Sequence, residues 1–258
     1  MSCLHIRRLS VFFPTQTGVV TAVDGVSFDH IGGETLALMG ETGCGKSVIA
    51  NAIMRLLPGN AVVEGEIQFK GIDLLRTDEK QLNTIRGKDI AIVFQNPSLA
   101  LNPIHKIGAQ IAEPLLVHTD MGKKQARSVA RNLLDQLGFD RLEKHLEAYP
   151  FQFSGGMNQR VLIASSMITS PTVLIADEPT KGLDYVLRDD VMQELSDIKH
   201  QNSSSLLLIT HDFDLSRRVA DRTAIMYAGE ILEIAPTSSF FHEPLHPYSR
   251  ALLRSLPE

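Results

Sequence analysis

One segment of the chain, Gly40-Glu-Thr-Gly-Cys-Gly-Lys-Ser47, limits the possible folds more than any other, because it fits the pattern G-x-x-x-x-G-K-[ST]. The apolar run Thr35–Met39 before it predicts a buried strand. Apolar residues at helical spacing from Val48 to Leu57 predict a helix behind it, ended by Pro58-Gly59. A glycine-rich turn between a strand and a helix points backbone N–H groups and the positive end of the helix dipole at phosphate oxygens. The segment is therefore predicted to bind the phosphates of a nucleotide.

In such a loop the lysine reaches the β- and γ-phosphates, and the hydroxyl that follows it ligates magnesium. We expect Lys46 and Ser47 to do this, and Lys46 is therefore also an expected catalytic residue. The other expected nucleotide contacts of the segment are Gly40, Thr42, Gly43, Cys44, Gly45 and Val48.

A second element combines an apolar strand with two acidic residues. Val173–Ala176 predicts a central strand, and Asp177 and Glu178 follow it directly. Neighbouring residues on a strand point to opposite sides. Asp177 is therefore expected to hold the magnesium shell, and Glu178 to face the attacking water as general base. The alternative is an acidic cap between strand and loop, without chemistry.

A third element is the start of an apolar helix, Ser154-Gly155-Gly156-Met157. A serine followed by two glycines that open a helix is an N-cap and also an anion site. Taken alone, the segment fits a simple cap equally well. Its position shortly before the acidic strand favours the anion site.

Hydrophobic patterns divide the chain into three stretches. The first third is rich in strands, and the middle, about 96–170, is helical. In that middle stretch an apolar face from Ala126 to Leu137 closes at Gly138, and Pro114 is expected to kink or break a helix. From Val173 onward strands and helices alternate, which implies a mostly parallel sheet covered on both sides. The remaining predicted elements are the strands Leu4–Phe13, Val19–Phe28, Glu66–Phe69, Ile90–Phe94 and Leu206–Thr210, a hairpin of Thr223–Tyr227 with Ile231–Ala235, a helix with Leu187 to Ile198 on one face, and a short helix near Ser249–Leu256.

Composition excludes several classes of protein. The formal net charge of −5 argues against a nucleic-acid partner. The two cysteines, Cys3 and Cys44, cannot form a disulfide framework, so a reducing compartment is expected. No apolar run approaches the roughly 20 residues that span a bilayer, and Met1–Phe13 does not read as a secretory signal. We expect a cytoplasmic chain that reaches a membrane only by docking onto a protein that spans it.

In this order, the elements resemble the ATP-binding cassette (ABC) family over nearly the whole chain. Ser154–Met157 corresponds to the family sequence LSGGQ, with Phe153 in place of leucine and Met157 in place of glutamine. The resemblance implies an α/β fold: a P-loop NTPase core with a mostly parallel sheet, an N-terminal antiparallel β subdomain and an inserted α-helical subdomain. It implies one ABC ATPase domain, with the core at 1–95 and 171–235, the helical subdomain at 96–170 and a short C-terminal extension at 236–258.

The resemblance also implies ATP and Mg²⁺ as cofactors and a role for each matching residue. Ser154, Gly155 and Gly156 contact the γ-phosphate of the ATP held by the opposite subunit of a head-to-tail dimer. Gln95 binds magnesium and senses the attacking water, and His211 contacts the γ-phosphate; both count as catalytic. Thr180–Asp184 is similar to the loop that crosses the dimer interface, with Asp184 as a contact, although Lys181-Gly182 is unusual there. Phe13 matches the aromatic residue that stacks on adenine, but Phe12 is an alternative.

Within the family, three stretches resemble the ATPase subunits of peptide and nickel importers: Phe94–Pro103, Tyr149–Met157 and His246–Leu253. This implies a second ABC ATPase subunit as partner, in a heterodimer or a homodimer, two membrane permease subunits and, indirectly, an extracytoplasmic substrate-binding protein. The chain would then be a peripheral protein on the cytoplasmic face of the cell membrane. The sequence leaves nickel and oligopeptides open as substrates.

Two other functions are weighed against this one. A soluble ABC ATPase of DNA repair or translation usually carries a long coiled-coil insert or two cassettes, and this sequence has neither. A P-loop GTPase would need D-x-x-G and N-K-x-D motifs. Asp135-Gln-Leu-Gly138 mimics the first, but it falls inside a predicted amphipathic helix.

Overall fold

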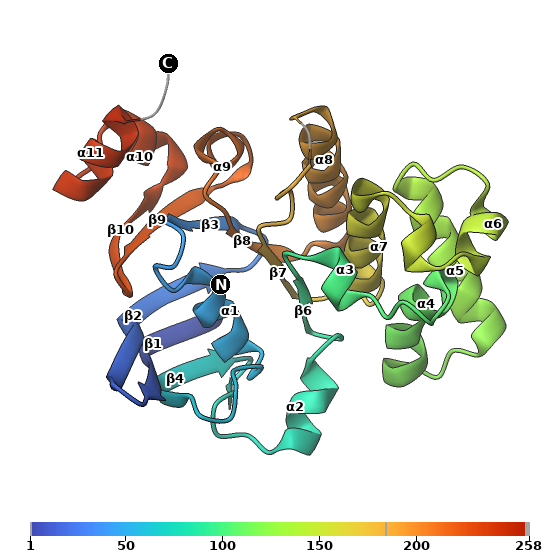
Figure 1. Ribbon diagram of the computed structural model, residues 1–258, viewed down its shortest axis with the longest axis horizontal. Coiled ribbons are helices and arrows are strands. Elements are labelled where there is room, and N and C mark those ends of the chain that lie inside the picture. The colour runs from blue at the N-terminus through green and yellow to red at the C-terminus, as the bar shows by residue number, and fades with distance from the viewer. Residues whose placement is uncertain (1, 184, 256–258) are drawn as a thin grey trace. The chain divides into compact units, whose positions relative to one another are not determined.

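The computed structural model describes residues 2–183 and 185–255 (Figure 1). The chain forms two compact units. The first joins Met1–Leu82 to Ser205–Glu258, and the second is Asn83–Ser204. The sequence predicted other boundaries, with a helical subdomain at 96–170 inserted into the core. That division stays a prediction.

The first unit contains an antiparallel sheet of four strands in the order β2-β1-β4-β5. Its strands are β1 Ser2–Thr15, β2 Gly18–Ile31, β4 Val62–Phe69 and β5 Ile72–Asp73. Leu4, Ile6 and Val11 of β1 are fully buried, and the pairing register shifts near Arg8, which has a φ of 48°. The predicted N-terminal antiparallel β subdomain is confirmed.

The first unit also contains the strands that carry the phosphate loop, in the order β10-β9-β3-β8. Their bounds are β3 Thr35–Gly40, β8 Ser205–Ile209, β9 Arg222–Tyr227 and β10 Glu230–Pro236. Strand β3 is buried along its whole length and pairs in parallel with both β8 and β9, whereas β10 is antiparallel to β9. The predicted hairpin of β9 and β10 is confirmed. Its turn residues, Ala228 and Gly229, both have positive φ, as a tight two-residue hairpin turn requires.

Among the described residues, the first unit contains the helices α1 Lys46–Ile53, α9 Phe213–Val219, α10 Thr237–His242 and α11 Pro247–Arg254. Phe240 of α10 is fully buried against Ala37, Met39 and Ile225, so the C-terminal helices pack on the strands that lead to the loop. A further helix, α2 Glu79–Ile85, lies across the boundary between the units. Helix α1 ends before the predicted stop at Pro58-Gly59, because Arg55 adopts a left-handed φ of 47°.

The second unit places two parallel strands among helices. Strands β6 Ile90–Val93 and β7 Val173–Asp177 pair in parallel. The helices are α3 Pro97–Ala100, α4 Ile107–His118, α5 Lys123–Gln136, α6 Leu142–Glu147, a 3₁₀ turn at Pro150–Gln152, α7 Gly155–Met167 and α8 Tyr185–Asn202. Helices α4 to α7 gather into one group, drawn from green to yellow in Figure 1. Among the described residues, the pairs β3–β8, β3–β9 and β6–β7 are parallel and β9–β10 is antiparallel. The predicted α/β fold class is therefore confirmed.

We predicted a kink or a break at Pro114, and a break is wrong, because α4 runs through this residue from Ile107 to His118. Proline has no N–H to donate to the carbonyl four residues back, which is that of Gln110. The Ser165 hydroxyl on α7 lies 3.4 Å from this carbonyl oxygen and donates to it instead. The neighbouring helix therefore satisfies the group that the proline leaves open.

Among the described residues, no helix combines the length and the hydropathy that crossing a bilayer would require.

Candidate functional site

The phosphate loop depends on glycine at positions where a side chain would not fit. Gly40 and Gly45 have φ values of 148° and 108°. A Cβ on Gly45 would overlap the carbonyl oxygen of Ala22, and one on Gly40 would overlap that of Met226. Strands β2 and β9 therefore press directly against the loop, and only glycine allows this approach.

Lys46, the first residue of α1, is 6% exposed and folds back under the loop. Its ammonium donates to the carbonyl oxygens of Gly40 and Glu41, each at 2.8 Å, and lies 3.7 Å from Cys44 Sγ. Contacts at both ends of the loop hold the positive charge at the position where phosphates are expected.

The hairpin turn between β9 and β10 also supports the loop. The Gly229 N–H donates to the Cys44 carbonyl oxygen at 3.1 Å, and the Gly229 carbonyl accepts from the Asp24 N–H at 2.9 Å. Cys44 itself is buried. The sequence predicted this hairpin, but no pattern indicated that its turn braces the loop.

The start of α1 remains open to an anion. Within the described residues, no side chain caps the helix and none in its first turn is acidic. Thr42 and Gly43 are exposed, and Ser47 and Val48 are half-buried. Backbone N–H groups at a helix start without a carboxylate partner bind phosphate well.

His211 and the loop emerge at the same edge of the sheet. Strands β3 and β8 run in parallel, with Leu38 opposite Ile209, and the Thr210 N–H donates to the Leu38 carbonyl at 3.2 Å. Gly40 ends β3, and His211 follows two residues after β8. The His211 side chain is exposed, as a phosphate contact requires.

In the second unit, Gln95 and the acidic pair also share a sheet edge. Strands β6 and β7 are parallel, with Val93 opposite Ala176, so the residues that follow them emerge together. Asp177 ends β7 and is 8% exposed, whereas Gln95 and Glu178 are half-buried.

We expected Asp177 and Glu178 to point to opposite sides because we took both to be strand residues, and this reason is wrong. Glu178 is not a strand residue, because β7 ends at Asp177 and Glu178 has a left-handed φ of 50°. A non-glycine residue in this conformation costs about 1–3 kcal/mol and is common at functional sites. The turn is stabilised by the Lys181 N–H, which donates to the Glu178 carbonyl at 3.1 Å.

Ser154 caps α7, as predicted. Its hydroxyl accepts the Met157 N–H at 3.3 Å, and both Ser154 and Gly155 are exposed. Gly156 is buried, and a Cβ there would lie 3.4 Å from Leu187 on α8. The serine and the first glycine thus face solvent, while the second glycine is buried beside α8, where a Cβ would make an ordinary van der Waals contact.

Two predicted nucleotide contacts are not located by the geometry: the aromatic residue that stacks on adenine and Asp184. Phe12 and Phe13 on β1 are both half-buried, opposite Thr21 and Val20, so neither is distinguished as the adenine partner. Asp184 lies outside the described residues.

Comparison with known proteins decides the family. Residues 23–181 match the ABC transporter family, and residues 232–258 match the C-terminal region of oligopeptide/dipeptide transporters. The chain belongs to the ABC transporter family. This ABC protein is therefore an ATP-hydrolysing, nucleotide-binding cassette.

Curated relatives place the cassette in the peptide branch of the family. It is 45% identical to the dipeptide transport ATP-binding protein DppD of Bacillus subtilis (strain 168), over 98% of this chain and 76% of the relative. It is 39% identical to the oligopeptide transport ATP-binding protein OppD of Salmonella typhimurium, over 98% of this chain and 76% of the relative. The sequence-based assignment to the peptide/nickel importer family is confirmed.

Solved structures confirm the cassette fold. A dimeric ATP-binding cassette in a post-hydrolysis state, bound to ADP and Pi, superposes with a TM-score of 0.81 at 26% identity, over 91% of this chain and 98% of that one. A second dimeric bacterial ABC transporter cassette matches with the same score, identity and coverage.

Proposed function

We propose that this cassette powers the uptake of peptides through a membrane permease. The observation that carries the proposal is that its similarity to dipeptide and oligopeptide transport ATP-binding proteins extends over 98% of its length. The similarity includes the C-terminal region typical of such transporters. The relatives compared above are named for peptides, which favours peptides over nickel.

In the proposed mechanism, the phosphates of ATP lie against the backbone N–H groups at the start of α1. Lys46 exchanges loop carbonyl oxygens for β- and γ-phosphate oxygens, and His211 contacts the γ-phosphate from the end of β8. Both side chains belong to the first unit, at one sheet edge. Ligands of parallel α/β sheets commonly bind at this edge, beyond the carboxyl ends of the strands.

Ser47, Gln95 and Asp177 are the proposed magnesium ligands. A hydroxyl, an amide oxygen and a carboxylate are hard oxygen donors, which Mg²⁺ prefers, so the residues present fit the ion. When bound, Mg²⁺ neutralises charge on the β- and γ-phosphate oxygens.

Glu178 is the proposed general base. It accepts a proton from water as the water oxygen attacks the γ-phosphorus, and the bond to the β-phosphate oxygen breaks to release ADP. Gln95, which follows β6 at the same edge, orients that water.

A second ATP-binding subunit completes the site in this proposal. Ser154, Gly155 and Gly156 of one subunit contact the γ-phosphate that the other holds, and the exposure of Ser154 and Gly155 at the start of α7 suits this role. The similar solved cassettes are dimers. We further propose a related second ATPase as the usual partner, two permease subunits at the cytoplasmic face of the membrane, and a substrate-binding protein that acts through them.

Peptide uptake by intact cells tests the function. Cells that lack the gene would be complemented with the wild type or with Glu178→Gln, and the entry of a labelled dipeptide, a labelled oligopeptide and nickel would be measured. We expect only the wild type to restore peptide entry, with nickel entry unchanged throughout. Loss of nickel entry alone would instead favour the nickel function. Unchanged entry of all three, with ribosomes or DNA recovered on purification, would favour the soluble ABC ATPase.

A further inference from the structure

Helix α11, near the C-terminal end of the described chain, reaches the phosphate loop. The Tyr248 hydroxyl donates to Glu41 Oε1 at 3.0 Å, across 207 positions of sequence. Glu41 is the first variable residue of the phosphate loop, directly after Gly40. Both residues belong to the first unit. This contact is not used in the mechanism above.

The Tyr248 ring is held in place by its surroundings. It packs against the Tyr227 ring at the end of β9, with centroids 4.6 Å apart. The Tyr248 N–H donates to Nδ1 of His246, the N-cap of α11. The ring also packs against the buried cluster around Phe240. The hydroxyl is therefore presented to Glu41 from a fixed position.

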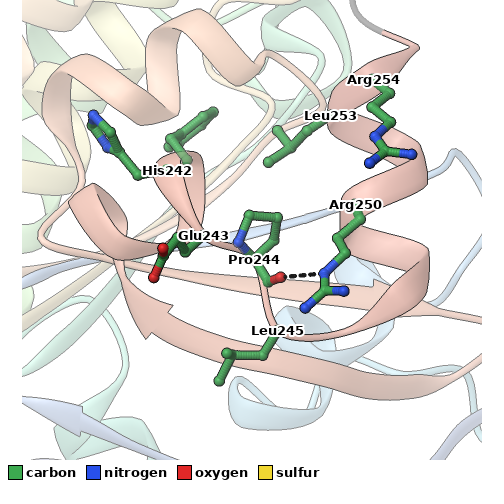
Figure 2. Close-up of a pocket in the computed structure, with 8 residues that line it drawn as sticks. His242, Glu243, Pro244, Leu245, Arg250, Leu253 and Arg254 are labelled. Carbon is green, nitrogen blue, oxygen red and sulfur yellow. Dashed lines mark hydrogen bonds between the residues drawn. The ribbon is translucent and has the colours of Figure 1, made fainter.

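The segment before α11 is fixed as well. The carboxylate of Glu233 on β10 is 9% exposed and accepts the N–H groups of Leu245 at 2.8 Å and His246 at 3.0 Å. Arg250 Nε donates to the Pro244 carbonyl oxygen at 2.8 Å, the dashed bond in Figure 2. Hydrogen bonds to charged groups are about twice as strong as those between neutral groups.

Glu41 connects this helix to the lysine of the loop. Its backbone carbonyl accepts the Lys46 ammonium at 2.8 Å and the Cys44 N–H at 3.3 Å. Its side chain accepts Tyr248. Contacts to both its main chain and its side chain restrict the conformations of Glu41. The Glu41 carbonyl oxygen is therefore held in position to accept the hydrogen bond from the Lys46 ammonium.

The Tyr248 hydroxyl stays a donor over the working pH range. Burial, followed by the hydrogen bond to Glu41 and its negative charge, raises the pKa of Tyr248 to about 12. At neutral pH the hydroxyl is therefore protonated.

We infer that Tyr248 is a positioning residue for nucleotide binding: by fixing Glu41, it holds the phosphate loop and Lys46 in the conformation that receives ATP. This inference rests on the proposed role of Lys46 in phosphate binding. It predicts that Tyr248 affects the affinity for ATP, because the loop must be ordered before binding, and not the chemical step once ATP is bound.

The test measures the Kd for ATP by titration calorimetry and kcat and KM for hydrolysis. Tyr248→Phe removes only the hydroxyl and keeps the packing of the ring. We expect its Kd and KM to rise about three- to tenfold, the scale of one typical intramolecular hydrogen bond, with kcat nearly unchanged. Tyr227→Phe is the matched control, because it removes the other hydroxyl of the same ring pair, and its constants should stay at the wild-type values.

A double-mutant cycle separates positioning from charge repulsion. Glu41→Ala should weaken ATP binding as much as Tyr248→Phe, and the double variant should be no worse than either, because both remove one shared contact. Wild-type affinity in Glu41→Ala would overturn the inference, because it would mean that Tyr248 only draws a negative charge away from the phosphates. Wild-type affinity in Tyr248→Phe, or an equal defect in Tyr227→Phe, would also overturn it.

Lys46→Ala separates this inference from the function on which it rests. If Lys46→Ala loses ATP binding while Tyr248→Phe binds like the wild type, only the positioning role fails. If Lys46→Ala itself binds ATP like the wild type, the phosphate-loop proposal fails first.

Discussion

The ammonium of Lys46 lies 2.8 Å from the carbonyl oxygen of Gly40, the last residue of β3. This contact joins the two ends of the phosphate loop through one side chain. A lysine that bonds neutral carbonyls keeps its full charge for an incoming anion. The arrangement therefore prepares the loop for phosphates before any are bound.

Replacing this lysine should abolish activity. In Lys46→Ala we expect the affinity for ATP to fall at least about tenfold, and hydrolysis to become undetectable, because a contact to the transferred phosphoryl group is lost. Titration calorimetry and phosphate release would measure the two effects. Lys123→Ala, which removes an exposed lysine at the start of α5, is the control and should behave like the wild type. Normal turnover in Lys46→Ala would contradict the proposed site.

Glu178→Gln should separate binding from chemistry. The amide fits the same turn but cannot accept the proton of the attacking water. We expect the Kd for ATP to stay near the wild-type value and kcat to fall about 10²- to 10⁴-fold, the range for removal of a general base. Single-turnover hydrolysis would measure the chemical step directly. Glu143→Gln, on the exposed side of α6, controls for the loss of one carboxylate. A variant that turns over at the wild-type rate would rule out Glu178 as the base.

The start of α7 should be needed for dimer closure. Ser154→Arg adds bulk and charge at an exposed position, so we expect the isolated subunit to bind ATP normally but to fail to dimerise with ATP. Light scattering in the Glu178→Gln background would measure the dimer, because ATP persists there. Ser154→Ala is the matched control for loss of the N-cap, which costs about 1 kcal/mol of stability. ATP-driven dimers of Ser154→Arg would count against the shared site.

An ion-pair cluster in the second unit should make stability depend on pH. Hydrogen bonds from Lys106 and then Arg127, each at 2.6 Å, together with the charges of both side chains, lower the pKa of Glu147 from 4.5. A carboxyl with a lower pKa in the folded state stabilises the fold above its ordinary pKa and loses this effect as the pH falls through the folded value.

We therefore expect Glu147→Gln to melt at a lower temperature than the wild type at neutral pH, and the difference to vanish in acid. Thermal unfolding followed by circular dichroism at low salt would measure it, since salt screens exposed pairs. Glu113→Gln, an exposed carboxyl on α4, should show no such difference. A gap between Glu147→Gln and the wild type that persists in acid would refute the ion-pair explanation.

Sequence patterns predicted the features that depend on nearby residues. The loop, the N-cap at Ser154 and the stop of α5 at Gly138, where φ is 72°, each follow from a few neighbouring positions. The patterns failed where a distant group intervened. Pro114 was expected to kink or break a helix, but α4 continues through it, and Ser165, from another helix, replaces the missing donor. The contact of Tyr248 with Glu41 joins residues 207 positions apart, and no local pattern encodes it.

Strand β3, which leads into the phosphate loop, has β8 on one side and β9 on the other, and both come from residues beyond 204. The segment that matches the ABC transporter family ends at residue 181. An expression fragment trimmed to that match would thus leave the central strand with two bare edges and would uncover the apolar surface beneath Phe240. Unpaired strand edges form hydrogen bonds with strands of other chains and so promote aggregation. The borders of the segment that matches the ABC transporter family are therefore not safe places to cut this protein.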